Sequence, residues 1–159
     1  MSDRPKRRRE SPGAGADAPL PTLPCACANL RRAARAVTQL YDEALRATGL
    51  SISQFTLLQV LVIAGPVTQG GLGRILILDS TTLTRTLRPL ERSGWIRRRA
   101  GKDRRERRVE MTTRGRARFR KAVPAWKRVQ KRLIGGIGRR RWDTLGRELS
   151  RIAALSRRG

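Results

Sequence analysis

Two cysteines are the most reactive side chains of this sequence. Cys25 and Cys27 form a Cys-x-Cys pair, and the chain has no His. The lack of His excludes Ser-His-Asp and Cys-His catalysis and His-ligated metal sites, and two Cys cannot complete a structural zinc site within one chain. The sequence also has no phosphate-cradling motif and no pair of carboxylates in an apolar setting. We therefore predict that the chain is not an enzyme and holds no metal or cofactor.

A second group of side chains suits contacts with nucleic acid. Hydroxyl and guanidinium groups between residues 80 and 88 can bind base edges and phosphates if they share one helix face. A basic stretch at residues 102–105 can reach the DNA backbone or a narrow minor groove, which attracts Arg. The candidate DNA-binding residues are Thr68, Ser80, Thr81, Thr82, Thr84, Arg85, Arg88, Lys102, Arg104 and Arg105.

The whole chain is strongly basic. Its 159 residues include 37 Lys and Arg against 12 Asp and Glu, which gives a net charge of +25. This charge predicts an acidic partner, either nucleic acid or an anionic membrane. Residues 97–121 alone hold 13 basic and 3 acidic residues, and this concentration favours nucleic acid. Because no apolar run approaches the roughly 18 residues of a membrane span and no apolar stretch follows the basic N-terminus, we expect no membrane partner and a cytoplasmic protein.

The N-terminal half of the chain is expected to contain a tail and two helices. Residues 1–24 are rich in Arg, Pro, Gly and Ala without apolar periodicity, which predicts a disordered basic tail. Apolar residues then recur at helical spacing from Leu30 to Leu45, and Gly49 is expected to end this helix. Ser51 and Gln54 form a capping box that predicts the start of a second helix, which Gly65-Pro66 would end.

Two further helices are predicted before the spacing of apolar residues changes from helical to strand-like. Thr68 is a cap for a short third helix with three glycines, each of which weakens a helix by about 1 kcal/mol relative to Ala, so this helix must depend on tertiary packing. Asp79 or Ser80 is expected to cap a fourth helix that ends at Gly94. The apolar residues of that helix, expected on its buried face, are Leu83, Leu87 and Leu90.

The C-terminal part predicts a β-hairpin and two helices. Trp95–Arg99 and Arg107–Thr112 are expected strands, because apolar and charged residues alternate in the second of them. Thr112 or Thr113 would cap a fifth helix, glycines at 135, 136 and 138 would break it, and a sixth would carry Trp142 to Leu155. A helix-turn-helix followed by a basic hairpin is typical of a winged helix-turn-helix protein. The predicted fold is therefore mainly α, with six helices and a small β-hairpin wing.

These residues resemble a known family. The segment from Leu78 to Arg85 with Leu90–Ile96 resembles the MarR family of bacterial transcriptional regulators, and residues 103–107 and 111–115 are similar to the wing of that family. The resemblance covers about residues 25–157. It implies dimerisation through the N- and C-terminal helices, at residues 25–48 and 113–157, and a DNA-binding winged helix at residues 51–112.

The resemblance also implies how the domain would meet DNA. The fourth helix would enter the major groove of a double-stranded operator. Arg104 or Arg105 would enter the adjacent minor groove, and Asp103 would orient a wing arginine by ion pairing. We therefore predict a homodimeric, sequence-specific repressor on a pseudo-palindromic operator. The alternative is a nonspecific basic nucleic-acid-binding or nucleoid-associated protein, which would show little preference among duplex sequences.

The signal that such a regulator would sense is left open by the sequence. The run from Cys27 to Tyr41 is similar to the organic-hydroperoxide-sensing branch of the family, in which a Cys is oxidised and Tyr hydroxyls bind its thiolate. Two other Tyr positions of that branch are Arg31 and Phe55 here. Arg31 could stabilise the thiolate by its charge instead. The alternatives are a small-molecule inducer of phenolic or aromatic type, or a purely structural role for Cys25 and Cys27.

Overall fold

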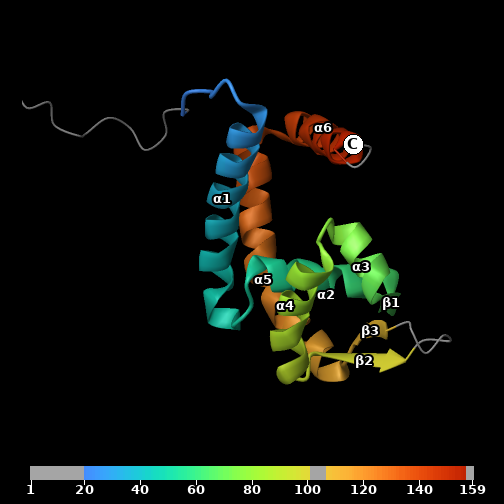
Figure 1. Cartoon of the computed structure of the whole chain (residues 1–159). Helices are drawn as coiled ribbons and strands as arrows, with labels where there is room; N and C mark the ends of the chain where they lie inside the picture. Colours follow the sequence, from blue (N-terminus) through green and yellow to red (C-terminus); the bar gives the residue numbers. More distant parts are fainter. Residues whose placement is uncertain (1–19, 101–106, 157–159) are drawn as a thin grey trace, which may run out of the picture. The chain divides into compact units, whose positions relative to one another are not determined.

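The computed structural model describes residues 20–100 and 107–156 (Figure 1). The chain divides into two compact units, residues 1–34 and 35–159, and each is treated by itself. The described residues contain six α-helices, one 3₁₀ helix and three strands, and the six α-helices are those that the sequence predicted. In chain order these are α1 (Ala26–Leu45), η1 (Arg46–Thr48), α2 (Ile52–Ala64), β1 (Val67–Thr68), α3 (Gln69–Leu76), α4 (Ser80–Arg92), β2 (Ile96–Ala100), β3 (Arg107–Met111), α5 (Thr113–Ile137) and α6 (Arg139–Leu155).

Four helices begin at capping residues that the sequence predicted. Ser51 and Gln54 form the complete capping box of α2. The Thr68 hydroxyl caps α3 by accepting from the Gly71 amide at 3.0 Å. For α4 and α5 the sequence left two candidate capping residues each. In the structure Asp79 rather than Ser80 caps α4, and Thr112 rather than Thr113 caps α5. Side-chain caps supply acceptors for backbone N–H groups that have no partner within a helix, so they fix where each helix starts.

Glycine ends several of the helices in the left-handed region. Gly49 follows η1 with φ of 68°, and Gly94 follows α4 with φ of 66°. After α4 the Trp95 amide donates to the Leu90 carbonyl and the Gly94 amide donates to the Glu91 carbonyl, both at 2.9 Å, which is a Schellman motif. The break expected across three glycines occurs at Gly138 alone, because α5 runs through the two earlier ones.

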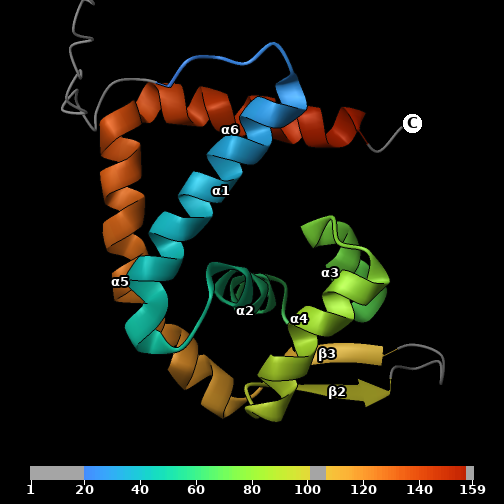
Figure 2. The same cartoon turned by 60° about the vertical axis from the view of Figure 1, so that its left-hand side comes forward.

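The sheet has one strand more than the predicted hairpin. Its order is β1-β3-β2, all antiparallel, and β2 and β3 lie side by side (Figure 2). Val67 pairs with Val109, and Ile96 pairs with Met111. No signal along the sequence pointed to β1, because a strand of two residues is too short to show alternation.

The core of the larger unit is mainly leucine, closed by stacked aromatic rings. Phe55 of α2 stacks on Phe119 and Trp126 of α5, with ring centroids 4.8 and 5.6 Å apart. The predicted buried face of α4 is confirmed, because its three leucines, Leu83, Leu87 and Leu90, are at most 2% exposed. This packing holds α4 by one face and leaves its opposite face in solvent.

Glycines allow close packing around α3 and at the start of α5. A Cβ on Gly73 would lie 3.0 Å from the carbonyl oxygen of Leu78, and one on Gly71 would lie 3.0 Å from the Thr68 hydroxyl. A Cβ on Gly115 would lie 2.0 Å from the Trp95 carbonyl oxygen. The glycines of α3 therefore lower its intrinsic helix propensity but permit close tertiary packing. The sequence predicted that this helix depends on such packing.

The smaller unit is described from residue 20 onward. The Asn29 amide nitrogen donates to the carbonyls of Leu23 and Cys25, and its oxygen accepts from the Leu23 amide. Arg32 donates to the Pro21 carbonyl at 2.7 Å. These bonds hold residues 21–25 against the first turns of α1, whereas most of the tail predicted at residues 1–24 lies outside the described residues.

Among the described residues, no single helix is both long enough and apolar enough to cross a membrane. By length and composition alone, the bent pair of Ala26–Thr48 and Ile52–Ala64 passes the same test together.

Candidate nucleic-acid interface

The outward face of α4 brings together five of the ten predicted DNA-binding residues. Five side chains line one shallow depression of about 360 Å³ on the surface of this helix, and four of them are exposed while Thr84 is half-buried. They supply hydroxyl and guanidinium groups without a carboxylate, so the depression is suited to base edges and phosphates. These residues are Ser80, Thr81, Thr84, Arg85 and Arg88.

Thr82 has a different role in the structure from its neighbours. It is exposed, but its hydroxyl donates to Asp79 Oδ2 at 2.6 Å and its amide donates to Asp79 Oδ1 at 2.8 Å. The hydrogen bonds from Thr82 lower the pKa of the Asp79 carboxyl, the hydroxyl contributing most. Thr82 therefore stabilises the cap of α4, and a base contact from this residue remains a prediction.

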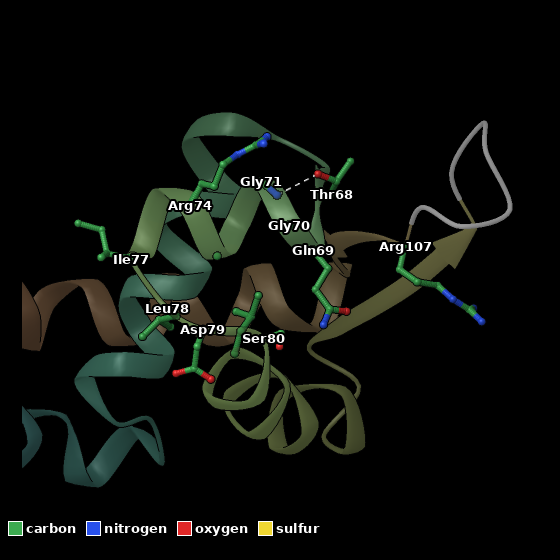
Figure 3. A pocket seen from close by; sticks show the side chains of 12 residues that line it. Thr68, Gln69, Gly70, Gly71, Arg74, Ile77, Leu78, Asp79, Ser80 and Arg107 are labelled. Atoms are coloured by element: carbon green, nitrogen blue, oxygen red, sulfur yellow. Dashed lines mark hydrogen bonds between the residues drawn. The ribbon is translucent and has the colours of Figure 1, made fainter. Parts of the chain in front are cut away.

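A larger groove lies between α3, the turn to α4 and β3. Figure 3 shows the side chains that line this groove, whose volume is about 840 Å³. Two arginines, Arg74 and Arg107, and one carboxylate, Asp79, line it, so its lining carries a net positive charge. Thr68 also lines it, with its hydroxyl engaged in capping α3, so the DNA contact predicted for Thr68 remains a prediction as well.

The turn within this groove contains a strained residue. Ile77 has φ of 52°, a left-handed conformation that β-branched side chains rarely adopt. Ile77 is the C-cap residue of α3, and its backbone amide donates to the Gly73 carbonyl. The turn between the two helices is thus tight and fixes where α4 starts.

Gln69 is a residue that the sequence reasoning missed. Its side-chain Nε2 donates to the Thr84 hydroxyl oxygen at 3.2 Å and so links the start of α3 to the outward face of α4. The sequence feature that could have identified Gln69 is its position directly after the capping residue Thr68, in the first turn of α3.

Two glutamates, also missed, bind the arginines of β2. Arg98 makes two hydrogen bonds of 3.0 Å through its Nε to the carboxylate of Glu91 at the end of α4. This interaction lowers the pKa of Glu91 and raises the pKa of Arg98. Arg97 and Arg99 both contact the Glu110 carboxylate, Arg99 at 2.8 Å. Two carboxylates therefore pair with three arginines of the basic stretch 97–121, and the Glu91–Arg98 pair ties β2 to α4.

The tip of the wing falls outside the described residues. β2 and β3 lead up to residues 101–106 from both sides. The predicted roles of Lys102, Asp103, Arg104 and Arg105 therefore remain predictions.

The candidate redox residues belong to both units. Cys25 and Cys27 are free and exposed, and Arg31 is exposed, all in the smaller unit. Tyr41 is buried in the larger unit, where its hydroxyl donates to Gln130 Oε1 of α5. Burial raises the pKa of Tyr41, so the hydroxyl stays protonated as this donor requires. The Tyr41 contact thus has a structural role, and its predicted role beside the Cys27 thiolate remains a prediction.

In the part of the chain that the structure describes, no group of three or more His, Cys, Asp or Glu side chains could hold a metal ion.

Sequence comparisons identify related proteins over part of the chain. The model of the MarR family matches residues 50–106. The uncharacterized HTH-type transcriptional regulator YwoH of Bacillus subtilis is 37% identical over 83 residues, which are 52% of this chain and 61% of that protein. The match to YwoH therefore spans less than two thirds of its length.

Solved structures extend the similarity to most of the chain. The M. tuberculosis transcriptional regulator MosR, in complex with DNA, is 38% identical with a TM-score of 0.77, covering 84% of this chain and 96% of MosR. A probable transcriptional regulator from Pseudomonas aeruginosa is 26% identical with a TM-score of 0.72, covering 80% and 96%. A mutant of E. coli MarR complexed with operator DNA shares the fold at 23% identity and a TM-score of 0.72, covering 79% and 91%. The predicted winged helix-turn-helix fold is therefore confirmed, and this chain belongs to the MarR family of transcriptional regulators.

Proposed function

We propose that this protein is a sequence-specific repressor that binds double-stranded DNA as a homodimer. The observation that carries the proposal is the outward face of α4, where five hydroxyl and guanidinium side chains line one depression. A helix fits the major groove of B-DNA, and such side chains bind base edges there. MosR, which is 38% identical over most of its length, was crystallised in complex with DNA.

The wing is proposed to bind beside the α4 contact. The strands β2 and β3 extend as a basic hairpin from the end of α4, and the Glu91–Arg98 pair links this hairpin to α4. We assign Arg104 or Arg105 to the minor groove, with Lys102 on the backbone and Asp103 orienting an arginine. The double variant Arg104→Ala with Arg105→Ala should therefore weaken binding to all duplex sequences at 150 mM salt.

The homodimer is supported by α6. None of its residues is buried in the single chain, although it carries a row of large apolar side chains. Leu145, Leu149 and Ile152 are about 40% exposed and Leu155 is 67% exposed. A helix with an apolar face needs a partner to cover it. We propose that the second copy supplies that partner, through residues 25–48 and 113–157 of each chain.

Selection from random duplexes tests the proposed function. A dimer with two copies of α4 should enrich a pseudo-palindrome with half-sites about one helical turn, or 10 bp, apart. Footprinting on the selected sequence should then give one discrete protected region. Enrichment of no sequence, with continuous protection, would favour the alternative of a nonspecific nucleic-acid-binding protein.

The signal is proposed to act through Cys27 or through a small ligand. Both cysteines of the pair are exposed and free, so an oxidant has access to them. Titration with an organic hydroperoxide should lower the affinity of the parent for DNA and leave the affinity of Cys27→Ser unchanged. The variants Cys25→Ser and Arg31→Ala show whether these two neighbours contribute to the response. An equal response of Cys27→Ser would exclude Cys27 as the sensor, whereas no response of the parent itself would leave a small-molecule inducer. We further propose a cytoplasmic location and no catalytic activity.

A further inference from the structure

One side-chain hydrogen bond joins the two helices of the helix-turn-helix. Gln69 Nε2 at the first position of α3 donates to Thr84 Oγ1 in the second turn of α4, at 3.2 Å. Both residues are half-buried, and the Gln69 side chain extends from the start of α3 toward α4 (Figure 3). Among the described residues, no other hydrogen bond joins a side chain of α3 to a side chain of α4. The contact therefore acts on the helix face proposed to meet DNA.

This bond gives the Thr84 hydroxyl a defined polarity. A hydroxyl has one hydrogen to donate and accepts through its oxygen. Thr82 donates its hydrogen to Asp79, and Thr86 donates its own to the Thr82 carbonyl at 2.9 Å. Within the part of the chain that the structure describes, the Thr84 hydrogen has no protein acceptor, whereas its oxygen already accepts from Gln69. Thr84 therefore offers a donor to the depression that it lines.

We infer that Gln69 is a specificity-determining residue that makes Thr84 a hydrogen-bond donor toward a base edge. The inference rests on the proposed function, in which α4 lies in the major groove. A donor there selects bases that present an acceptor, namely O6 or N7 of guanine, N7 of adenine or O4 of thymine. It disfavours cytosine, which presents an amino group. Gln69 acts through Thr84 and is a positioning residue.

Parallel selections from random duplexes test this inference. The chains compared are the parent, Gln69→Ala, Gln69→Glu, Thr84→Val and Gln69→Ala with Thr84→Val. Gln59→Ala is the matched control, because Gln59 is a half-buried glutamine like Gln69 but lies on α2, outside the groove. Thermal unfolding of each chain verifies that it is folded. Preference at each base pair is measured rather than total affinity, because Gln69→Glu also adds a charge that DNA repels at every sequence.

The expected change is confined to one base pair in each half-site. Gln69→Ala relaxes the preference there by roughly fivefold, about the effect of one hydrogen bond, whereas Gln59→Ala keeps the parent preference. Gln69→Glu accepts the Thr84 hydrogen, turns the hydroxyl oxygen toward the base and shifts preference toward cytosine or toward the amino group of adenine. In the Thr84→Val background, Gln69→Ala changes nothing further at that base pair.

Other outcomes overturn the inference in distinguishable ways. If both Gln69 variants keep the parent preference at every base pair, the inference is wrong and the proposed function stands. If Gln69→Ala changes the preference equally in the Thr84→Val background, Gln69 does not act through Thr84 and the inference is again wrong. If the parent enriches no sequence at all, the proposed function fails and the inference fails with it.

Discussion

At the residue scale, Gly115 has the tightest packing of the glycines in the described chain. A Cβ at this position would meet the Trp95 carbonyl oxygen at 2.0 Å and the Met111 side chain at 3.0 Å. The Thr112 hydroxyl accepts from the Gly115 amide, so the start of α5 cannot move away without losing its cap. The carbonyl belongs to the backbone between α4 and β2, which also has little freedom to shift.

Gly115→Ala should therefore destabilise the protein. We expect a loss of about 2–3 kcal/mol in the free energy of unfolding, as for overpacking of a well-packed site. Gly135→Ala is the matched control in the same helix, because nothing lies within 4 Å of its added Cβ. It should be neutral or stabilising by up to about 1 kcal/mol from helix propensity. Urea unfolding of both variants measures the difference, and equal stabilities would contradict the close contact at Gly115.

A substitution at Ile77 should instead increase the free energy of unfolding. Its backbone has φ of 52° and its side chain is 57% exposed, so the left-handed conformation is strained while little burial compensates for it. Ile77→Asn should stabilise the protein by about 1 kcal/mol, because Asn tolerates this region. The same change at Ile75, which is 53% exposed within α3, should destabilise the helix. A loss of thermal stability for Ile77→Asn would show that the turn carries no such strain.

At the element scale, the ion pair between Glu91 and Arg98 joins α4 to the wing. Arg98 lowers the pKa of Glu91 in the folded protein, chiefly by hydrogen bonding. A carboxyl whose folded pKa lies below its unfolded value stabilises the protein above the unfolded pKa of about 4.3. That contribution is lost as the pH falls through the folded pKa.

Glu91→Gln should therefore be less stable than the parent at neutral pH and equally stable in acid. Because the two side chains are 36% and 26% exposed, we expect a difference of only about 0.5–1 kcal/mol at pH 7. Glu148→Gln removes an exposed pair with Arg151 and serves as the control with almost no effect. Unfolding measured between pH 7 and pH 3 follows the difference. A difference that persists unchanged at pH 3 would contradict the assigned role of the charge.

The elements of this protein were predictable where local chemistry determines them. The caps of α2 to α5, the leucine face of α4 and the outward set that includes Arg85 and Arg88 all follow from residue type and spacing. β1 was not predictable, since it exists only because Val67 and Thr68 pair with β3. The side-chain contacts of α4 with Gln69 and Arg98 were missed for the same reason. They join residues of different elements, and periodicity along one element carries no information about them.

At the scale of the whole molecule, the apolar face of α6 predicts self-association. Leu149→Asp would place a charge in the proposed dimer interface, which should shift the monomer–dimer equilibrium by at least about tenfold toward monomer. Ser150→Asp adds the same charge at the neighbouring exposed position and is the control. Analytical ultracentrifugation over a range of concentrations measures both variants. If Leu149→Asp remained as dimeric as the parent, α6 would not form the interface.

The charge of +25 also belongs to this scale. It would attract DNA of any sequence, whereas we propose that sequence preference comes from the residues on α4. A regulator and a nonspecific basic protein would both bind DNA, and both would bind less tightly as salt increases. Only the ratio of affinities for different duplexes separates them.

That ratio is the decisive measurement for sequence recognition. Dissociation constants are measured for the parent at 150 mM salt on its selected pseudo-palindrome and on a scrambled duplex of equal length and composition. We predict binding to the pseudo-palindrome at least roughly 10³-fold tighter, as for specific regulators, and a clear reduction of this ratio by Arg85→Ala. Equal affinity for the two duplexes, or a ratio unchanged by Arg85→Ala, would contradict sequence recognition through α4.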